Sequence, residues 1–224
     1  FAGEKRMDLH VVPAFSVRTT PDISIIPASV AAAPGAEREV FVNVTSGMKG
    51  PADATVALEA PGGWRVEPAS APIAFSHEDE SITVRVTVAP PARVAPGEYR
   101  LQATVTSPTP GAQRFDRGYQ VVEYPHIERR HVYLPAQTQL KVVDVKTMPN
   151  VMVGYVMGVG DAVPPVLREL GARLDFIDTN ELAWGDLSKY DVIFAGVRAY
   201  EKRLDLRAYN RRLLDYVEGG GTFI

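Results

Sequence analysis

Apolar and polar positions alternate along the first half of the chain. From about Val11 to Val122, short runs rich in Val, Ile and Thr carry an apolar residue at every second position, and turns of Pro, Gly, Ser and Ala separate them. A period of two is typical of strands with one buried face. The clearest runs are 24–26, 39–45, 54–58, 81–88, 99–105 and 118–122. About seven or eight such strands, with turns every ~8–12 residues, predict an antiparallel β-sandwich.

The pattern changes after Pro149. Residues 151–157 form a near-continuous apolar run, as expected of a strand covered on both faces. A helix capped by Asp161 is predicted next, with Pro164 and Pro165 in its first turn and its end at Gly171. The remaining predicted elements are strands at 174–177 and 191–195, a helix at 206–217 with Tyr209, Leu213, Leu214 and Val217 on its apolar side, and a strand after 219–221. This order predicts a doubly wound parallel α/β sheet.

Composition and charge narrow the function classes. Apolar residues make up 46% of the 224 positions, and the net charge is −3, so nothing favours nucleic-acid binding or an anionic membrane. No apolar run reaches the ~18 residues of a membrane span. Without Cys there is no thiol nucleophile and no Cys-based metal site. The chain begins with Phe1 and ends on what reads as a buried strand, which predicts a piece of a longer protein.

Proline marks the domain division, because 16 of the 18 Pro lie before position 150. We expect a lead-in segment or edge strand at 1–19, an immunoglobulin-like sandwich at 20–123, a linker with one strand at 124–149, and the first half of an α/β domain at 150–224. The sandwich has no Cys–Trp–Cys framework, so it is not of the antibody type.

Short sequence motifs in the first half resemble those of a known family. Pro61-Gly-Gly-Trp64 and Ala95-Pro-Gly-Glu-Tyr99, together with Pro34-Gly35, resemble the bacterial NEW-type immunoglobulin-like module associated with alpha-galactosidases, over about 20–106. Trp64 is expected to plug one end of the sandwich, with glycan contact as the alternative. Tyr99 is expected to tie the chain to a neighbouring loop.

The second half resembles another family. Tyr190-Asp-Val-Ile193 and the joint from Tyr216 to Ile224 resemble class I glutamine-amidotransferase-like domains, of the wider flavodoxin-like type, over 150–224. Catalytic members carry a Cys nucleophile and a later His. This chain has no Cys and no His after His131, so the resemblance does not imply amidase activity.

The order of the two domains, with the linker 124–135 and the segment 3–17, resembles the C-terminal region of LmbE/PIG-L-type deacetylases. That resemblance implies a zinc-dependent N-acetyl-sugar deacetylase domain upstream, and hence no cofactor in this chain and an exported bacterial protein. Its metal motif is absent here, so no catalytic residue can be carried over.

The cleft expected for a parallel sheet lies beyond the carboxyl ends of its strands. The candidate residues there are Gly158, Gly160, Asp161, Asp178, Arg198 and Tyr200. The pair of glycines with an acid 20 positions after the first resembles the start of a dinucleotide fingerprint, but Val163 stands at the third glycine position. Pro164 and Pro165 also remove two helix amides that would bind pyrophosphate, so a tight turn with Asp161 and Asp178 as helix caps is favoured.

Other candidate groups are weaker. Arg198 and Tyr200 could meet an anion or a sugar hydroxyl, although an ion pair of Arg198 with Glu201 or Asp205 is favoured. His10, His77, His126 and His131 show no metal-ligand spacing, and the loop 77–80 is a weak calcium candidate that reads better as a solvated turn.

Three hypotheses follow. The first is a non-catalytic accessory region that supplies spacing, docking or glycan contact to the rest of its own chain. The second is the start of a hydrolase or amidotransferase whose nucleophile lies beyond Ile224. The third is an oligomerisation or protein-interaction module.

Overall fold

The computed structural model describes residues 9, 11–31, 35–108, 111–148 and 150–224. Most of the predicted lead-in segment, together with His10, Pro34 and Pro149, therefore lies outside the described residues. The chain forms two compact units, one comprising the residues up to Ser24 and Val30–Val143, the other Ile25–Ser29 and Asp144–Ile224. Among the described residues, no helix has the length and apolar character needed to cross a membrane.

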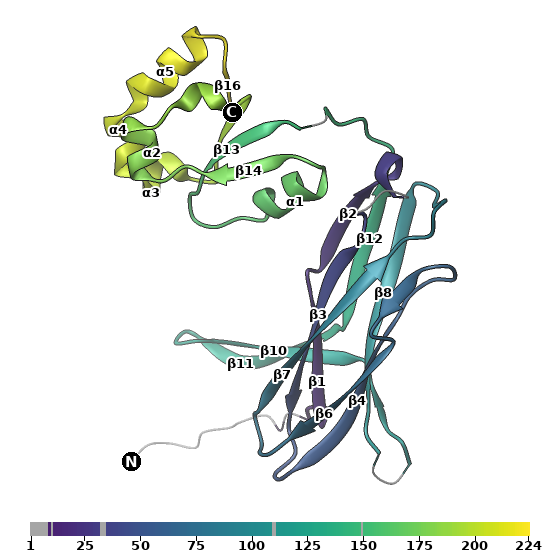
Figure 1. Cartoon of the computed structure of the whole chain (residues 1–224). Coiled ribbons are helices and arrows are strands. Elements are labelled where there is room, and N and C mark those ends of the chain that lie inside the picture. Colours follow the sequence, from purple (N-terminus) through teal and green to yellow (C-terminus); the bar gives the residue numbers. More distant parts are fainter. Residues whose placement is uncertain (1–8, 10, 32–34, 109–110, 149) are drawn as a thin grey trace, which may run out of the picture. The chain divides into compact units, whose positions relative to one another are not determined.

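Two sheets make up the sandwich (Figure 1). The first has the order β1-β3-β7-β5 and the second the order β2-β12-β8-β4-β6, with β9 paired to β8. The strands of the first sheet are β1 (Phe15–Thr20), β3 (Arg38–Ser46), β7 (Ser81–Ala89) and β5 (Arg65–Glu67). Those of the second are β2 (Ile23–Pro27), β12 (Gln137–Val143), β8 (Gly97–Thr106), β4 (Ala52–Glu59), β6 (Ser70–Phe75) and β9 (Arg114–Phe115). A 3₁₀ turn, η1 (Ala28–Val30), follows β2.

The alternating pattern explains the core of this unit. In β3, Val40, Val42 and Val44 are fully buried, while the residues between them face outward. Inward residues of β1, β4, β6, β7, β8 and β12 belong to the same cluster. The pairs β1–β3, β3–β7, β4–β8 and β8–β12 are antiparallel. Five of the six predicted runs lie within strands of these two sheets, so the prediction of an immunoglobulin-like β-sandwich is confirmed, whereas the run 118–122 lies in β10 (Arg117–Tyr124), outside both sheets.

The sandwich is wider than the predicted range 20–123. Strand β1 begins at Phe15, and β12 lies within the predicted linker. Thr138, Leu140 and Val142 alternate into the core, and this burial makes 137–143 a strand of the second sheet rather than a connection. Residues on both sides of the predicted boundary at 123/124 form a hairpin, β10 (Arg117–Tyr124) and β11 (Ile127–Pro135), which projects from the sandwich (Figure 1).

Four parallel strands form the sheet of the second unit, in the order β14-β13-β15-β16. They are β13 (Met152–Val156), β14 (Arg173–Phe176), β15 (Val192–Ala195) and β16 (Thr222–Phe223). The helices are α1 (Val163–Glu169), α2 (Thr179–Trp184), α3 (Ala199–Lys202), α4 (Leu204–Ala208) and α5 (Asn210–Glu218), with a 3₁₀ turn η2 (Leu187–Lys189) before β15.

The predicted helix 206–217 is wrong in two respects. The chain breaks at Tyr209 into α4 and α5, and the buried side is formed by Leu206, Leu213 and Tyr216. Leu214 and Val217, which were expected on the apolar side, are exposed by 47% and 43%. Within α5, Leu213 and Tyr216 lie three positions apart on the face that meets the core, so Leu214 and Val217, one position further along, fall on the neighbouring exposed face.

Candidate functional site

The predicted cleft lies at the point where the order of the parallel strands reverses. The chain passes from β13 outward to β14 and then crosses to β15 on the other side of β13. The loops that follow β13 and β15 therefore leave the sheet side by side, which is where open α/β sheets commonly bind ligands. These loops carry four of the six predicted residues, while Tyr200 lies in α3 directly after the second loop and Asp178 follows β14.

Asp161 ties the two loops together. Its carboxylate accepts hydrogen bonds from the Tyr155 hydroxyl at 2.7 Å and from the backbone amides of Val163 and Val197 at 3.0 and 3.1 Å. Burial raises the pKa of Asp161, but the bonds from Tyr155, Val197 and Val163 outweigh it, so the pKa lies below its ordinary value. The Tyr155 ring is buried, and burial followed by the bond to Asp161 raises the pKa of its hydroxyl. At neutral pH, Asp161 is therefore ionised and the Tyr155 hydroxyl keeps its proton.

Two glycines allow the loops to cross at close range. A Cβ atom on Gly158 would lie 2.0 Å from the carbonyl oxygen of Val197, and one on Gly196 would lie 3.0 Å from the Tyr155 ring. The amide of Val159 donates to that same Val197 carbonyl at 3.1 Å. Gly160 has a positive φ of 88° and completes the turn. Because the backbone of Val197 covers Gly158, the glycine pair serves a loop crossing rather than the approach of a pyrophosphate.

The predicted caps are only partly correct. Asp178 caps α2, and its carboxylate accepts the amide of Glu181 at 2.8 Å. For α1 the N-cap residue is Ala162, not Asp161. Asp161 stands one position earlier and bonds the amide of the first helical residue, because its carboxylate also serves Tyr155 and Val197.

Arg198 and Tyr200 are engaged within the chain. Arg198 has a positive φ of 56°, and its guanidinium binds Glu201 through both side-chain oxygens, with Nε to Oε2 at 2.5 Å. The Tyr200 hydroxyl donates to Asn210 at 2.7 Å, and burial raises its pKa. The favoured ion pair of Arg198 is thus with Glu201, while Asp205 pairs with Arg203.

Sequence reasoning missed the Arg203–Asp205 pair beside Asp178. Arg203 binds the Asp205 carboxylate and donates to the carbonyl of Ile177 at 3.2 Å, while the Thr179 hydroxyl donates to Asp205 at 2.9 Å. This cluster joins the end of β14 to the first turns of α2 and α4. The sequence Arg203-Leu-Asp205 at the start of α4 could have indicated this ion pair.

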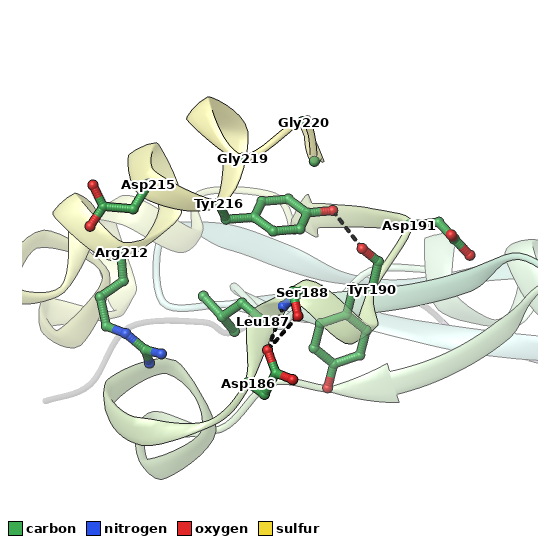
Figure 2. Close-up of a pocket in the computed structure, with 11 residues that line it drawn as sticks. Asp186, Leu187, Ser188, Tyr190, Asp191, Arg212, Asp215, Tyr216, Gly219 and Gly220 are labelled. Carbon is green, nitrogen blue, oxygen red and sulfur yellow. Dashed lines mark hydrogen bonds between the residues drawn. The ribbon is translucent and has the colours of Figure 1, made fainter.

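One cavity of the α/β unit, with a volume of about 590 Å³, lies at the amino ends of β15 and β16 (Figure 2). Two hydrogen bonds join groups that line it: Tyr216 donates to the carbonyl of Tyr190 at 2.9 Å, and Asp186 accepts from Ser188. Arg212 caps the end of α2 through the carbonyls of Leu182 and Gly185. None of the six predicted residues lines this cavity.

A second cavity, of about 550 Å³, lies beside the edge strand β14 and the helix α2. Among the predicted residues it includes Asp178. The other polar and aromatic residues that line it were not predicted. Trp184, which follows Asp178 by six positions, could have indicated an aromatic group at this site.

In the sandwich, Trp64 is half-buried against the core, and its ring lies 5.2 Å from that of Tyr99. The Tyr99 hydroxyl donates to the Ala95 carbonyl at 2.8 Å, so it ties down the loop before β8. In the loop 77–80, the calcium candidate, Glu80 instead accepts from the amide and hydroxyl of Ser76. No group of three His, Cys, Asp or Glu side chains in the described part of the chain is arranged to hold a metal ion.

Residues 32–107 match the family model of the NPCBM-associated, NEW3 domain of alpha-galactosidase. No curated protein matches the chain. Among solved structures, WR4, an MSP family member from C. elegans, is 10% identical, with 57% of this chain and 97% of WR4 covered and a TM-score of 0.31. Trypsin-activated alpha-2-macroglobulin from Escherichia coli is 14% identical, with 58% of this chain and 7% of that protein covered and a TM-score of 0.35. A family 123 glycoside hydrolase from Clostridium perfringens is 7% identical, with 65% and 30% covered and a TM-score of 0.35. The family match lies within the sandwich and covers about a third of the chain.

Proposed function

We propose that the chain is a non-catalytic accessory region of a larger carbohydrate-active protein. The match of residues 32–107 to the NEW3 domain of alpha-galactosidase carries this proposal, because it links the sandwich to an enzyme of carbohydrate metabolism. Within the sandwich, the half-buried Trp64 packs against Tyr99, which suits a structural role better than a catalytic one.

The second unit supports the same proposal. A catalytic acid, base or nucleophile must be free to meet its substrate. Asp161, Asp178 and Arg198 are instead engaged with the loops and helices around them. These groups hold the carboxyl end of the sheet in place.

We infer further that the larger protein is an exported bacterial deacetylase of the LmbE/PIG-L type. The support is the resemblance of the domain order, of the linker 124–135 and of the amidotransferase-like segment 150–224. The zinc that this resemblance implies would belong to the upstream domain, since the described residues offer no set of ligands for it.

Two measurements on the chain test the proposal. With Zn²⁺ and N-acetylglucosamine oligomers, we expect no acetate release above the rate without protein, and calorimetry should show weak saturable binding of at least one sugar. Acetate release that depends on Zn²⁺ would overturn the non-catalytic assignment. Ammonia release from glutamine would favour the amidotransferase alternative instead.

The hairpin β10–β11 favours a second candidate, an oligomerisation module. Its apolar side chains are exposed on a ribbon that pairs with neither sheet, at 58% for Tyr124, 44% for Val132 and 43% for Leu134. Exposed apolar groups gathered on one element are typical of interaction surfaces. Sedimentation equilibrium of the chain and of the variant Val132→Thr tests this, and a monomer at every concentration would exclude self-association.

A further inference from the structure

The cavity beside β14 has the size and form of a small-ligand site. It lies between the edge strand β14, the helix α2 and the 3₁₀ turn η2, and its volume of about 550 Å³ falls within the range of ligand pockets. Trp184 and Tyr190 contribute aromatic rings, and Asp175 and Asn180 contribute polar side chains. The ring of Phe176 lies on the other face of β14, against Tyr155 and Arg168.

The aromatic side of the cavity is unusually open. Trp184 is exposed by 81%, whereas Tyr190 is buried. The indole of Trp184 lies 6.5 Å from the ring of Tyr209, which supports it from the break between α4 and α5. A supported and exposed indole offers a flat π-face, and the C–H face of a pyranose ring carries the slight positive charge that such a face attracts.

Polar groups without partners stand beside this ring. Asn180 precedes Trp184 by four residues, so the two side chains share one face of α2. The amide of Asn180, the indole N–H of Trp184 and the carboxylate of Asp175 make no hydrogen bond to any residue that the structure describes. A sugar presents hydroxyl donors and acceptors at its rim, which these groups can bond.

Charge selects among sugars. Glu181 is neutralised by Lys189, whose Nζ lies 2.7 Å from it. Asp175 and Asp178 leave the cavity with a net negative charge, and only Asp178 is engaged in a helix cap. An acidic sugar is therefore disfavoured, and an ammonium group on the sugar is favoured by Asp175.

We propose that the cavity lined by Asp175, Asn180 and Trp184 binds an amino-hexopyranose, with its ring stacked on the indole and its ammonium group near Asp175. This inference rests on the proposed carbohydrate-associated function and names the ligand class and the site.

The two tryptophans allow a direct test. In the variant Trp64→Phe, Trp184 is the only indole, so its emission reports on the cavity. Glucosamine, N-acetylglucosamine and glucuronate serve as probes. We expect a saturable emission change with glucosamine at a dissociation constant of about 1–10 mM, which is the affinity of a small polar ligand. Glucuronate should bind at least about tenfold more weakly, and N-acetylglucosamine, which lacks the ammonium group, should bind more weakly than glucosamine.

Three variants of the full chain sharpen the test, with calorimetry as the readout. Trp184→Ala should weaken glucosamine binding about tenfold. Because this side chain is exposed, the circular dichroism spectrum of the variant should match that of the parent chain. Asp175→Asn should remove the preference for glucosamine over N-acetylglucosamine. Asp215→Asn makes the same charge change at an exposed carboxylate outside this cavity and should leave binding unchanged.

Each other outcome overturns a distinct claim. Glucosamine binding that survives Trp184→Ala would refute this site while leaving the carbohydrate-associated function standing. Equal binding of glucuronate and glucosamine would refute the amino-sugar assignment. Failure of every sugar tested to bind the chain would refute both this inference and glycan contact as the role of the accessory region.

Discussion

Asp205 offers a quantitative test of the electrostatics of the α/β unit. Its side chain is only 12% exposed and accepts hydrogen bonds from the Arg203 Nε at 2.8 Å and from the Thr179 hydroxyl at 2.9 Å. The bond from Arg203, followed by that from Thr179, lowers the pKa of Asp205 from 3.8 to about 2 despite its burial. This difference makes the charged carboxylate a source of stability.

The magnitude follows from the two pKa values. At 1.36 kcal/mol per pKa unit, a drop from 3.8 to about 2 contributes about 2 kcal/mol to the free energy of unfolding. Because the pKa is lower in the folded state, the contribution is complete above about pH 5 and is lost as the pH falls toward 2. About half of it is gone at pH 3.

The substitution Asp205→Asn should therefore destabilise the unit by about 2 kcal/mol at pH 7 and by about 1 kcal/mol at pH 3. Urea unfolding followed at 222 nm measures this, because all the α-helices of the described chain lie in the second unit. The control Glu201→Gln removes the exposed pair with Arg198 and should cost less than about 0.5 kcal/mol. A loss with Asp205→Asn that is equal at pH 7 and pH 3 would refute the assigned pKa.

Three further substitutions test the loops and the sandwich. Asp161→Ala leaves the buried Tyr155 hydroxyl without its acceptor and should cost about 2–4 kcal/mol in urea unfolding, and adding Tyr155→Phe should recover part of that loss. Gly158→Ala places a methyl group 2.0 Å from the Val197 carbonyl and should cost about 3 kcal/mol or more by thermal unfolding, whereas Gly62→Ala, with no atom within 4 Å, should stay within about 1 kcal/mol. Tyr99→Phe removes the hydrogen bond to the Ala95 carbonyl and should cost about 1 kcal/mol, measured by Trp64 fluorescence in a Trp184→Phe background. If the variant is as stable as the parent, the hydrogen bond to Ala95 contributes no more than the bond to water that replaces it in the unfolded chain.

Local alternation was enough to predict the strands of the sandwich. Val40, Val42 and Val44 fall at every second position and are all buried, so the periodicity predicts both the strand and which of its faces is buried. The same reasoning did not assign Thr138 to the core, because whether a half-polar run joins a sheet depends on partner strands distant in the sequence. Leu140 pairs with Tyr99, some 40 residues earlier.

The candidate site was predictable only in part. The strand ends placed Asp161 and Asp178 near the edge of the sheet, and the cap formed by Asp178 follows from its position before α2. That Asp161 would bond Tyr155 and Val197 depends on how two loops cross, which no local pattern encodes. The helix break at Tyr209 was missed for a related reason, since Leu206 and Leu213 satisfy a helical spacing across it.

The crossing of the loops at Gly158 and Val197 also has a consequence for motion. Loops at the carboxyl end of a sheet are often the mobile parts that open and close over a ligand. Here the amides of Val159, Gly196 and Val197 are all bonded across the crossing, to Val197, Val156 and Asp161. Displacing one loop would break these bonds together, so this end of the sheet should act as a fixed rim, and any adaptation to a ligand would fall to side chains such as Trp184 on the outer edge.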